Sequence, residues 1–144
     1  LEYPVELLKA YLDTSIFSIL GLMSVLMIAF AIERFLFYRQ VDLNKYSNLH
    51  DLDIDLTSHL TVISTVGANA PYVGLLGTVL GILITFYDLG HSANLDAQTI
   101  MVGLALALKA TALGLAVAIP AIIIYTSLLR IADVKKARWE AMNS

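Results

Sequence analysis

The sequence predicts an all-α membrane protein with three transmembrane helices. Hydrophobic residues make up 58% of its 144 residues and charged residues only 15%, a composition outside the range of soluble globular domains. The charged residues are also segregated, so that three long apolar runs remain. In hydrocarbon only helices and closed barrels satisfy every backbone N–H and C=O group. A barrel would alternate polar and apolar residues in segments of about ten, so the continuous runs predict helices.

The first apolar run predicts a transmembrane helix over residues 14–37. Its side chains are bulky on all sides, which is typical of an outer helix that faces lipid. The acidic residues 1–13 before it predict either a short interfacial helix, with Asp13, Thr14 or Ser15 as the N-cap of the span, or a disordered end. A signal peptide would carry basic residues, a short apolar core and a small-residue cleavage site, so we expect this run to remain in the protein.

The second span is predicted over residues 57–88, with Thr57 or Ser58 as its N-cap. Between the first two spans, residues 38–56 contain four aspartates and predict a solvated linker. A short turn over residues 89–97 leads into the third span. This order makes the second and third spans an antiparallel hairpin.

The third span is predicted over residues 98–129, followed by a tail, 130–144, whose basic segment Lys135–Arg138 ends the helix. At about 1.5 Å per residue, each of the last two spans is roughly 48 Å long, whereas the hydrocarbon core of a bilayer is about 30 Å thick. We therefore expect their extra turns to project into the cytoplasm. Pro71 and Pro120 lie inside these helices and predict kinks.

The distribution of Lys and Arg orients the chain. Apart from Lys9, and Lys109 within the third span, these residues lie at or after the ends of the first and third spans, whereas the turn at 89–97 contains none. By the positive-inside rule, residues 38–56 and 130–144 are cytoplasmic, and the N-terminus and the turn face the opposite compartment. The basic tail suits anionic lipid headgroups better than nucleic acid.

Small residues mark one face of each of the last two spans. Gly74 and Gly81 lie seven residues apart, and Gly77 forms a GxxxG pair with Gly81. In the third span the small residues follow the three-and-four spacing of one helix face; they are Gly103, Ala107, Ala110, Gly114, Ala118 and Ala121. Because such faces let membrane helices approach closely, they predict a tight hairpin within an oligomer.

Threonine hydroxyls are the first candidates for a polar site inside the membrane. Thr78 and Thr85 share one face of the second span, and Thr111 lies in the third. Antiparallel pairing about the turn places Thr78 level with Leu106 and Thr111 level with Val73, so the depths of Thr78 and Thr111 differ by roughly 7 to 8 Å. A hydroxyl donates and accepts and so can relay a proton, although a single membrane threonine more often bonds its own i−4 carbonyl.

Lys109 is the second candidate, because it is the only charged residue of the third span. It lies on nearly the opposite face from Thr111, near or just past the midplane of the bilayer. Its expected partners are Glu33, backbone carbonyls, a lipid phosphate or a carboxylate of another chain. Glu33 itself adjoins Arg34 at the end of the first span, where an interfacial charge pair is expected. The cores of the spans contain no carboxylate, which a proton relay normally needs.

The residue types exclude several other classes of function. The chain has no cysteine, and its three histidines lack metal-ligand spacing, so neither a thiolate nor a metal site nor a cofactor is predicted. No set of nucleophile, base and metal ligands is present. We therefore expect the protein not to be an enzyme.

Several stretches of the sequence resemble the ExbB/TolQ/MotA proton-channel family, and within it the ExbB subunits most. These stretches are Ser64–Gly67, Ala70–Val79, Ala110–Leu115 and Ala118–Ala121. The likeness covers roughly residues 60–129, and its glycines, prolines and threonines match in order. The resemblance is therefore specific to the second and third spans.

The resemblance implies a homopentamer in the inner membrane of a Gram-negative bacterium. Such a pentamer encloses two single-span helices of ExbD, which supply an aspartate, and is coupled to TonB. Thr78 and Thr111 fall on the two threonines that line the family's pore. The implied mechanism is proton flow along the interface of ExbB and ExbD, which drives a relative movement that TonB passes to an outer-membrane transporter.

The sequence departs from the family pattern at two positions. Leu106 stands where the family commonly has a glutamate, and Lys109 stands where the pattern is usually apolar. We expect Lys109 to make a different contact, with another subunit or with lipid. Residues 41–55 are also short for the family. Two alternatives remain: a TolQ-like subunit of the Tol-Pal envelope system, and a membrane scaffold that conducts nothing. A MotA-type stator would have four spans.

Overall fold

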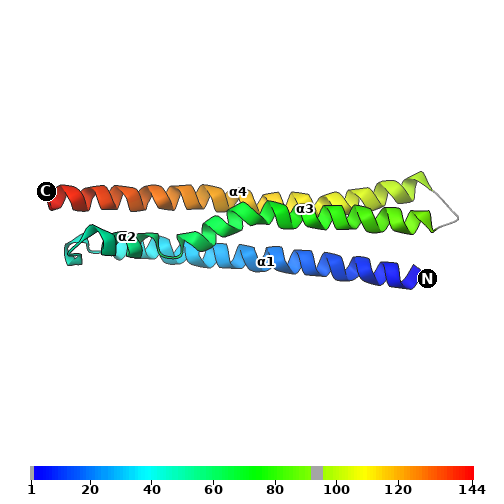
Figure 1. Cartoon of the computed structure of the whole chain (residues 1–144), viewed down its shortest axis with the longest axis horizontal. Helices are drawn as coiled ribbons and strands as arrows, with labels where there is room; N and C mark the ends of the chain where they lie inside the picture. The colour runs from blue at the N-terminus through cyan, green and yellow to red at the C-terminus, as the bar shows by residue number, and fades with distance from the viewer. Residues whose placement is uncertain (1, 92–95) are drawn as a thin grey trace.

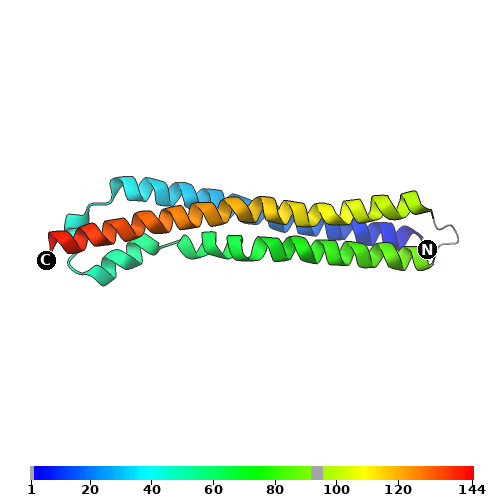
Figure 2. The same ribbon diagram turned by 90° about the horizontal axis from the view of Figure 1, so that it is seen from above.

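The computed structural model describes residues 2–91 and 96–144, which form four α-helices. They are α1 (Glu2–Gln40), α2 (Leu49–Thr57), α3 (Leu60–Gly90) and α4 (Ala97–Met142), with a 3-10 turn over Leu43–Lys45 before α2. The helices α1, α3 and α4 run side by side, and α2 lies at the end of the molecule where α4 finishes (Figure 1). Figure 2 shows the same elongated bundle from above. Three helices are long and apolar enough to cross a membrane, which confirms the predicted helical architecture with three candidate spans.

The helix α1 is continuous, which corrects the predicted break near residue 13. The expected N-cap residues lie inside it. Pro4 falls in the first turn, where proline is tolerated, and neither proline nor glycine lies between it and Gly21, so no helix breaker ends the helix between its two parts. Against the other helices α1 buries one stripe, consisting of Ile16, Leu20, Met27, Arg34 and Tyr38.

Residues 38–56 are not a simple solvated linker, because all of α2 except its last residue lies within them. The side chain of Asn48 caps this helix by accepting a hydrogen bond from the backbone N–H of Asp51. Leu52 and Leu56 lie four residues apart and are fully buried, as expected for the apolar stripe of a short amphipathic helix. The aspartates dominate the composition of the segment and obscure this stripe in the sequence.

The junction between α2 and α3 also differs from the prediction. Thr57 is the last residue of α2, so neither Thr57 nor Ser58 caps α3. The N-cap is His59, which has φ 67 and makes no side-chain cap hydrogen bond. Its ring stacks on that of Phe30 of α1 at 4.7 Å between centroids. The junction between α2 and α3 is therefore held by contact with α1 rather than by a local cap.

The helix α4 begins after Asp96, whose side chain accepts from the backbone N–H of Gln98. It passes without a break through the segment Lys135–Arg138, which was predicted to end it, and continues to Met142. Contacts with α2 extend the bundle along this part of α4. Residues 92–95 of the predicted turn lie outside the described residues.

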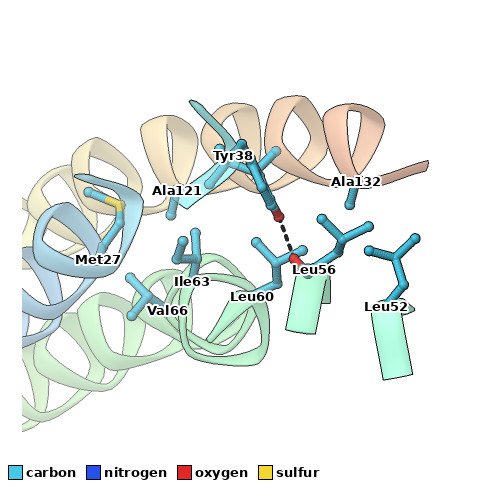
Figure 3. Packing of buried hydrophobic residues seen from close by; sticks show 10 residues of the cluster. Met27, Tyr38, Leu52, Leu56, Leu60, Ile63, Val66, Ala121 and Ala132 are labelled. Carbon is cyan, nitrogen blue, oxygen red and sulfur yellow. Dashed lines mark hydrogen bonds between the residues drawn. The ribbon is translucent and has the colours of Figure 1, made fainter. Parts of the chain in front are cut away.

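Buried apolar side chains at the α2 end form one cluster to which all four helices contribute (Figure 3). Its members include Met27, Tyr38, Leu52, Leu56, Leu60, Ile63, Val66, Ala121 and Ala132. A second cluster joins α1, α3 and α4 nearer the N-terminus and consists of Ile16, Leu20, Ala70, Ala110 and Ala118. The short helix α2 is thus part of the core.

The helices α3 and α4 approach until their backbones touch. A Cβ atom added at Gly74 would lie 2.5 Å from the carbonyl oxygen of Ala110 and 3.0 Å from the Cα atom of Gly114. One added at Gly114 would lie 2.6 Å from the carbonyl oxygen of Ala70. Real Cβ atoms do not come this close to backbone atoms, so only glycine permits this packing.

The contact continues along both helices. A Cβ atom at Gly77 would lie 3.1 Å from the side chain of Ile16 of α1, and one at Gly81 would lie 3.1 Å from Ala107 of α4. Pro71 and Pro120 lie inside α3 and α4 without ending them. The small residues therefore face the partner helix along most of the hairpin.

We predict that Gly74→Ala destabilises the hairpin by about 1–3 kcal/mol, because the added methyl group overlaps a backbone carbonyl that cannot move aside. Gly21→Ala is the matched control, since no atom lies within 4 Å of a Cβ atom there and alanine favours a helix over glycine. Thermal unfolding in detergent measures both. Equal melting temperatures for the two variants would contradict the close backbone contact.

Candidate functional site

Thr78 and Thr111 meet between α3 and α4. The hydroxyl of Thr78 donates to the carbonyl oxygen of Ala107 at 2.8 Å, and its oxygen lies 2.5 Å from the hydroxyl oxygen of Thr111. Because Thr78 has a single hydroxyl proton, the arrangement is a chain in which Thr111 donates to Thr78 and Thr78 donates to Ala107. Thr78 is only 6% exposed, whereas Thr111 is partly exposed, so the chain reaches the surface of the hairpin through Thr111.

This contact corrects the predicted difference in depth of roughly 7 to 8 Å between the two threonines. The helix α3 extends to Gly90, past the point where the turn was expected to begin, and this shifts its register against α4. Accordingly Gly74 faces Gly114, and Thr85 lies beside Gly103. Neither Leu106 nor Val73 takes the predicted place opposite a threonine hydroxyl.

Thr85, the other candidate of α3, behaves differently. Its hydroxyl donates to the carbonyl oxygen of Gly81, four residues earlier in the same helix, at 2.8 Å. This is the common local bond of a threonine in a membrane helix. Thr78 instead forms its hydrogen bonds with α4. Of the two threonines, Thr78 is therefore the one that links the helices of the hairpin.

Lys109 is exposed and points away from the threonine pair. Its ammonium nitrogen lies 5.4 Å from the ring centroid of Phe17 of α1, which places it only about 6 Å along the helix axis from the level of Asp13. It is therefore near the N-terminal end of the charge-free run of α1, not near its middle as predicted. Glu33 lies about 24 Å further along α1, so Glu33 of the same chain is not its partner.

Glu33 instead pairs with Arg34, whose Nε atom lies 2.5 Å from a carboxylate oxygen. Arg34 is only 3% exposed and donates to the carbonyl oxygens of Asp55 at 2.6 Å and Leu56 at 3.5 Å. The hydroxyl of Tyr38 donates to the same Leu56 oxygen at 2.6 Å (Figure 3). These carbonyls belong to the last turn of α2, where backbone acceptors lack helical partners.

Arg34 and Tyr38 thus cap the C-terminal end of α2, a role that the sequence does not reveal. A charged pair at the end of a predicted span is equally compatible with headgroup contact. The acceptors that define this role are two backbone carbonyls about twenty residues further along the chain. Residue type does not indicate which backbone carbonyl a side chain will contact.

The helix α4 holds α2 from the other side. Lys136 forms an ion pair with Asp53 at 2.9 Å, and the indole N–H of Trp139 donates to the backbone carbonyl of Tyr46 at 3.2 Å. The hydroxyl of Tyr46 donates to Asp55 at 2.7 Å. Burial and this bond raise the pKa of Tyr46 to about 12, so it stays protonated and donates throughout the physiological pH range.

Among residues 2–91 and 96–144 no group of three His, Cys, Asp or Glu side chains is placed to hold a metal ion. The candidate polar groups of this hairpin are neutral hydroxyls and the outward-facing ammonium group of Lys109, beside the exposed amide of Asn69, which donates to the carbonyl oxygen of Thr65 in its own helix. Such groups can orient water or a proton donor, but a threonine hydroxyl does not itself hold a proton as a charge carrier at neutral pH.

Comparison with known proteins gives consistent matches. Residues 40–141 match the MotA/TolQ/ExbB proton channel family. The chain is 54% identical to the biopolymer transport protein ExbB of Helicobacter pylori over 99% of this chain and 98% of that protein. It is 49% identical to ExbB of Aquifex aeolicus over 96% of this chain and 93% of that protein. The Tol-Pal system protein TolQ of Pseudomonas aeruginosa is 47% identical over 49% of this chain and 30% of that protein.

We predict that Arg34→Gln loosens α2 from the bundle, because the variant loses the charge-assisted hydrogen bond to Asp55, worth about 1.5–3 kcal/mol, and a weaker, longer one to Leu56. Hydrogen exchange of the α2 amides should accelerate, while exchange in the middle of α3 and α4 stays slow. Arg39→Gln is the matched control, since Arg39 is exposed at the end of the same helix. Unchanged exchange in α2 of the Arg34 variant would show that these bonds do not hold the helix.

Proposed function

Because the chain belongs to the MotA/TolQ/ExbB proton channel family, we propose that it is the ExbB-type subunit of an inner-membrane proton motor. This motor uses the proton motive force to energise outer-membrane transport through TonB. The observation that carries the proposal is the hydroxyl chain from Thr111 through Thr78, which crosses from α4 to α3. Among residues 2–91 and 96–144 it is the side-chain hydrogen bonding that links α3 to α4.

The hydroxyl chain is incomplete as a proton path by itself. Its hydrogen-bond partners in this chain are another hydroxyl and a backbone carbonyl, and neither binds a proton at neutral pH. A carboxylate must therefore come from another chain. We propose that five copies enclose two single-span ExbD helices, and that an aspartate of ExbD faces Thr111, the more exposed end of the chain.

The proposed mechanism assigns separate roles to hydroxyl and carboxylate. The ExbD aspartate takes up and releases the proton, while Thr78 and Thr111 donate and accept hydrogen bonds that hold the aspartate, or a water next to it, in a dry environment. One charge crossing about 100 mV supplies about 2.3 kcal/mol. Several protons are therefore needed for a large movement of the subunits.

The orientation in this proposal has the N-terminus in the periplasm and the C-terminus in the cytoplasm. The basic residues of α1 and α4 near the α2 end support it by the positive-inside rule. The α2 unit, fastened by Arg34 and Lys136, would then lie on the cytoplasmic side, where basic side chains of the tail meet anionic headgroups.

The ExbB assignment is favoured over TolQ by the extent of the matches. The Helicobacter pylori ExbB and this chain match along nearly their whole lengths, whereas the match to TolQ covers about half of this chain and under a third of TolQ. A scaffold that conducts nothing needs only the glycine faces. Substituting the threonine pair therefore distinguishes a conducting subunit from a scaffold.

We predict that Thr78→Val and Thr111→Val each lower proton-motive-force-dependent uptake by on the order of tenfold, because about 1–3 kcal/mol is lost when a buried hydrogen-bond partner is removed. Thr78→Ser and Thr111→Ser should retain activity. Thr126→Val is the control, since Thr126 is exposed on α4 and bonds only to carbonyls of its own helix. Uptake is measured in cells that co-express the partner subunits, and affinity purification checks that each variant still assembles.

Wild-type uptake in both valine variants, with assembly intact, would exclude conduction through the threonine pair. The scaffold function would then be the better description of this chain.

A further inference from the structure

An apolar groove of about 290 Å³ lies along the outer side of the contact between α1 and α4. We propose that this groove and Lys109 together bind one anionic phospholipid, with the phosphate at the ammonium group of Lys109 and an acyl chain in the groove. The groove is lined by Phe17, Gly21, Leu113, Ala116 and Val117, among others. Phe17 joins its two parts, because the ring also lies beneath the Lys109 ammonium group.

The groove exists because small residues leave space between two bulky helices. No atom lies within 4 Å of a Cβ atom added at Gly21, and Ala116 faces the same opening from α4. Leu20 is buried at the floor of the groove, so the opening is backed by packed side chains and does not extend into the hairpin. Apart from Ser24, its lining is apolar and suits a hydrocarbon chain.

The depth of the groove follows from the charges of α1. The charge-free run between Asp13 and Glu33 is roughly 28 Å long, close to the hydrocarbon thickness of about 30 Å. Lys109 lies at the level of Phe17, about 6 Å inside the Asp13 edge, within reach of the headgroup layer for a long lysine side chain. Gly21 lies about 6 Å deeper still. The groove therefore runs from the cation toward the midplane.

This order of groups matches one occupant. A phospholipid places its phosphate at the edge of the hydrocarbon and its chain toward the midplane, as Lys109 and the groove require. Among the described residues Lys109 forms no ion pair, and its charged group contacts only an aromatic ring. Asp13 lies one turn before Phe17 in α1 and lines a separate small pocket with Lys9 and Leu106. An ammonium group facing lipid is stabilised by an anion.

Native mass spectrometry of the intact complex, reconstituted in nanodiscs of phosphatidylglycerol and phosphatidylcholine, tests the proposal. The wild type should retain phosphatidylglycerol in preference to phosphatidylcholine. Lys109→Gln should lower the retained phosphatidylglycerol per chain about fivefold, the effect expected for one basic side chain near a membrane surface. Lys109→Arg should restore it. Gly21→Leu should lower it to a similar extent, because the new side chain fills the groove where the fold leaves space.

Lys9→Gln is the control for charge, because Lys9 lies on the same side of the membrane but lines the other pocket. Retention equal to the wild type in Lys109→Gln would overturn the proposal, and so would a loss in Lys9→Gln of the same size. Unchanged retention in Gly21→Leu would show that the groove does not hold the chain. A changed number of subunits with unchanged lipid would identify the groove as an interface between copies. None of these readouts depends on proton conduction.

Discussion

The backbone contact between α3 and α4 at Gly74 and Gly114 sets the position of everything else in the hairpin. At this contact the helices are separated by less than a side chain, so side chains one turn away are forced into direct contact. Thr78 lies one turn after Gly74 and therefore reaches a carbonyl and a hydroxyl of α4. In lipid, apolar burial between helices contributes little, so the close approach and the hydroxyl bonds that it permits are the main attractions available.

At the other end, the fold depends on the capture of the last carbonyls of α2 by Arg34 and Tyr38. Burying a guanidinium group is costly unless its donors are satisfied, and here two backbone carbonyls and Glu33 satisfy them. The same contact holds the junction between α2 and α3, because His59, the N-cap of α3, follows Leu56 by three residues with a left-handed backbone. The register of α3 against α1 thus depends on the contacts of Arg34, Tyr38 and His59 at the α2 end of the bundle.

The sequence predicts the features that depend on local pattern and misses those that depend on contacts between residues far apart in the chain. Long charge-free runs specify the three helices, and three-and-four spacing of small residues marks the face of α4 that meets α3. The register could not be predicted, since it depends on how far α3 continues past Asp88, and two extra residues bring Thr78 to Thr111. The role of Arg34 was equally inaccessible, because its acceptors are backbone atoms of a helix hidden among aspartates.

The threonine pair and Lys109 occupy the same depth on opposite faces of α4, and this has an electrostatic consequence. A helix is about 10 Å across, so a bare ammonium group at Lys109 would raise the energy of a proton carried past the pair on the proposed carboxylate by about 1–2 kcal/mol at an effective dielectric constant near 20. A phosphate held at Lys109 would cancel most of this repulsion. If protons pass this pair as proposed, neutralising the Lys109 ammonium group is the direct way to keep their path accessible. Lipid binding and conduction would then be coupled through a single turn of α4.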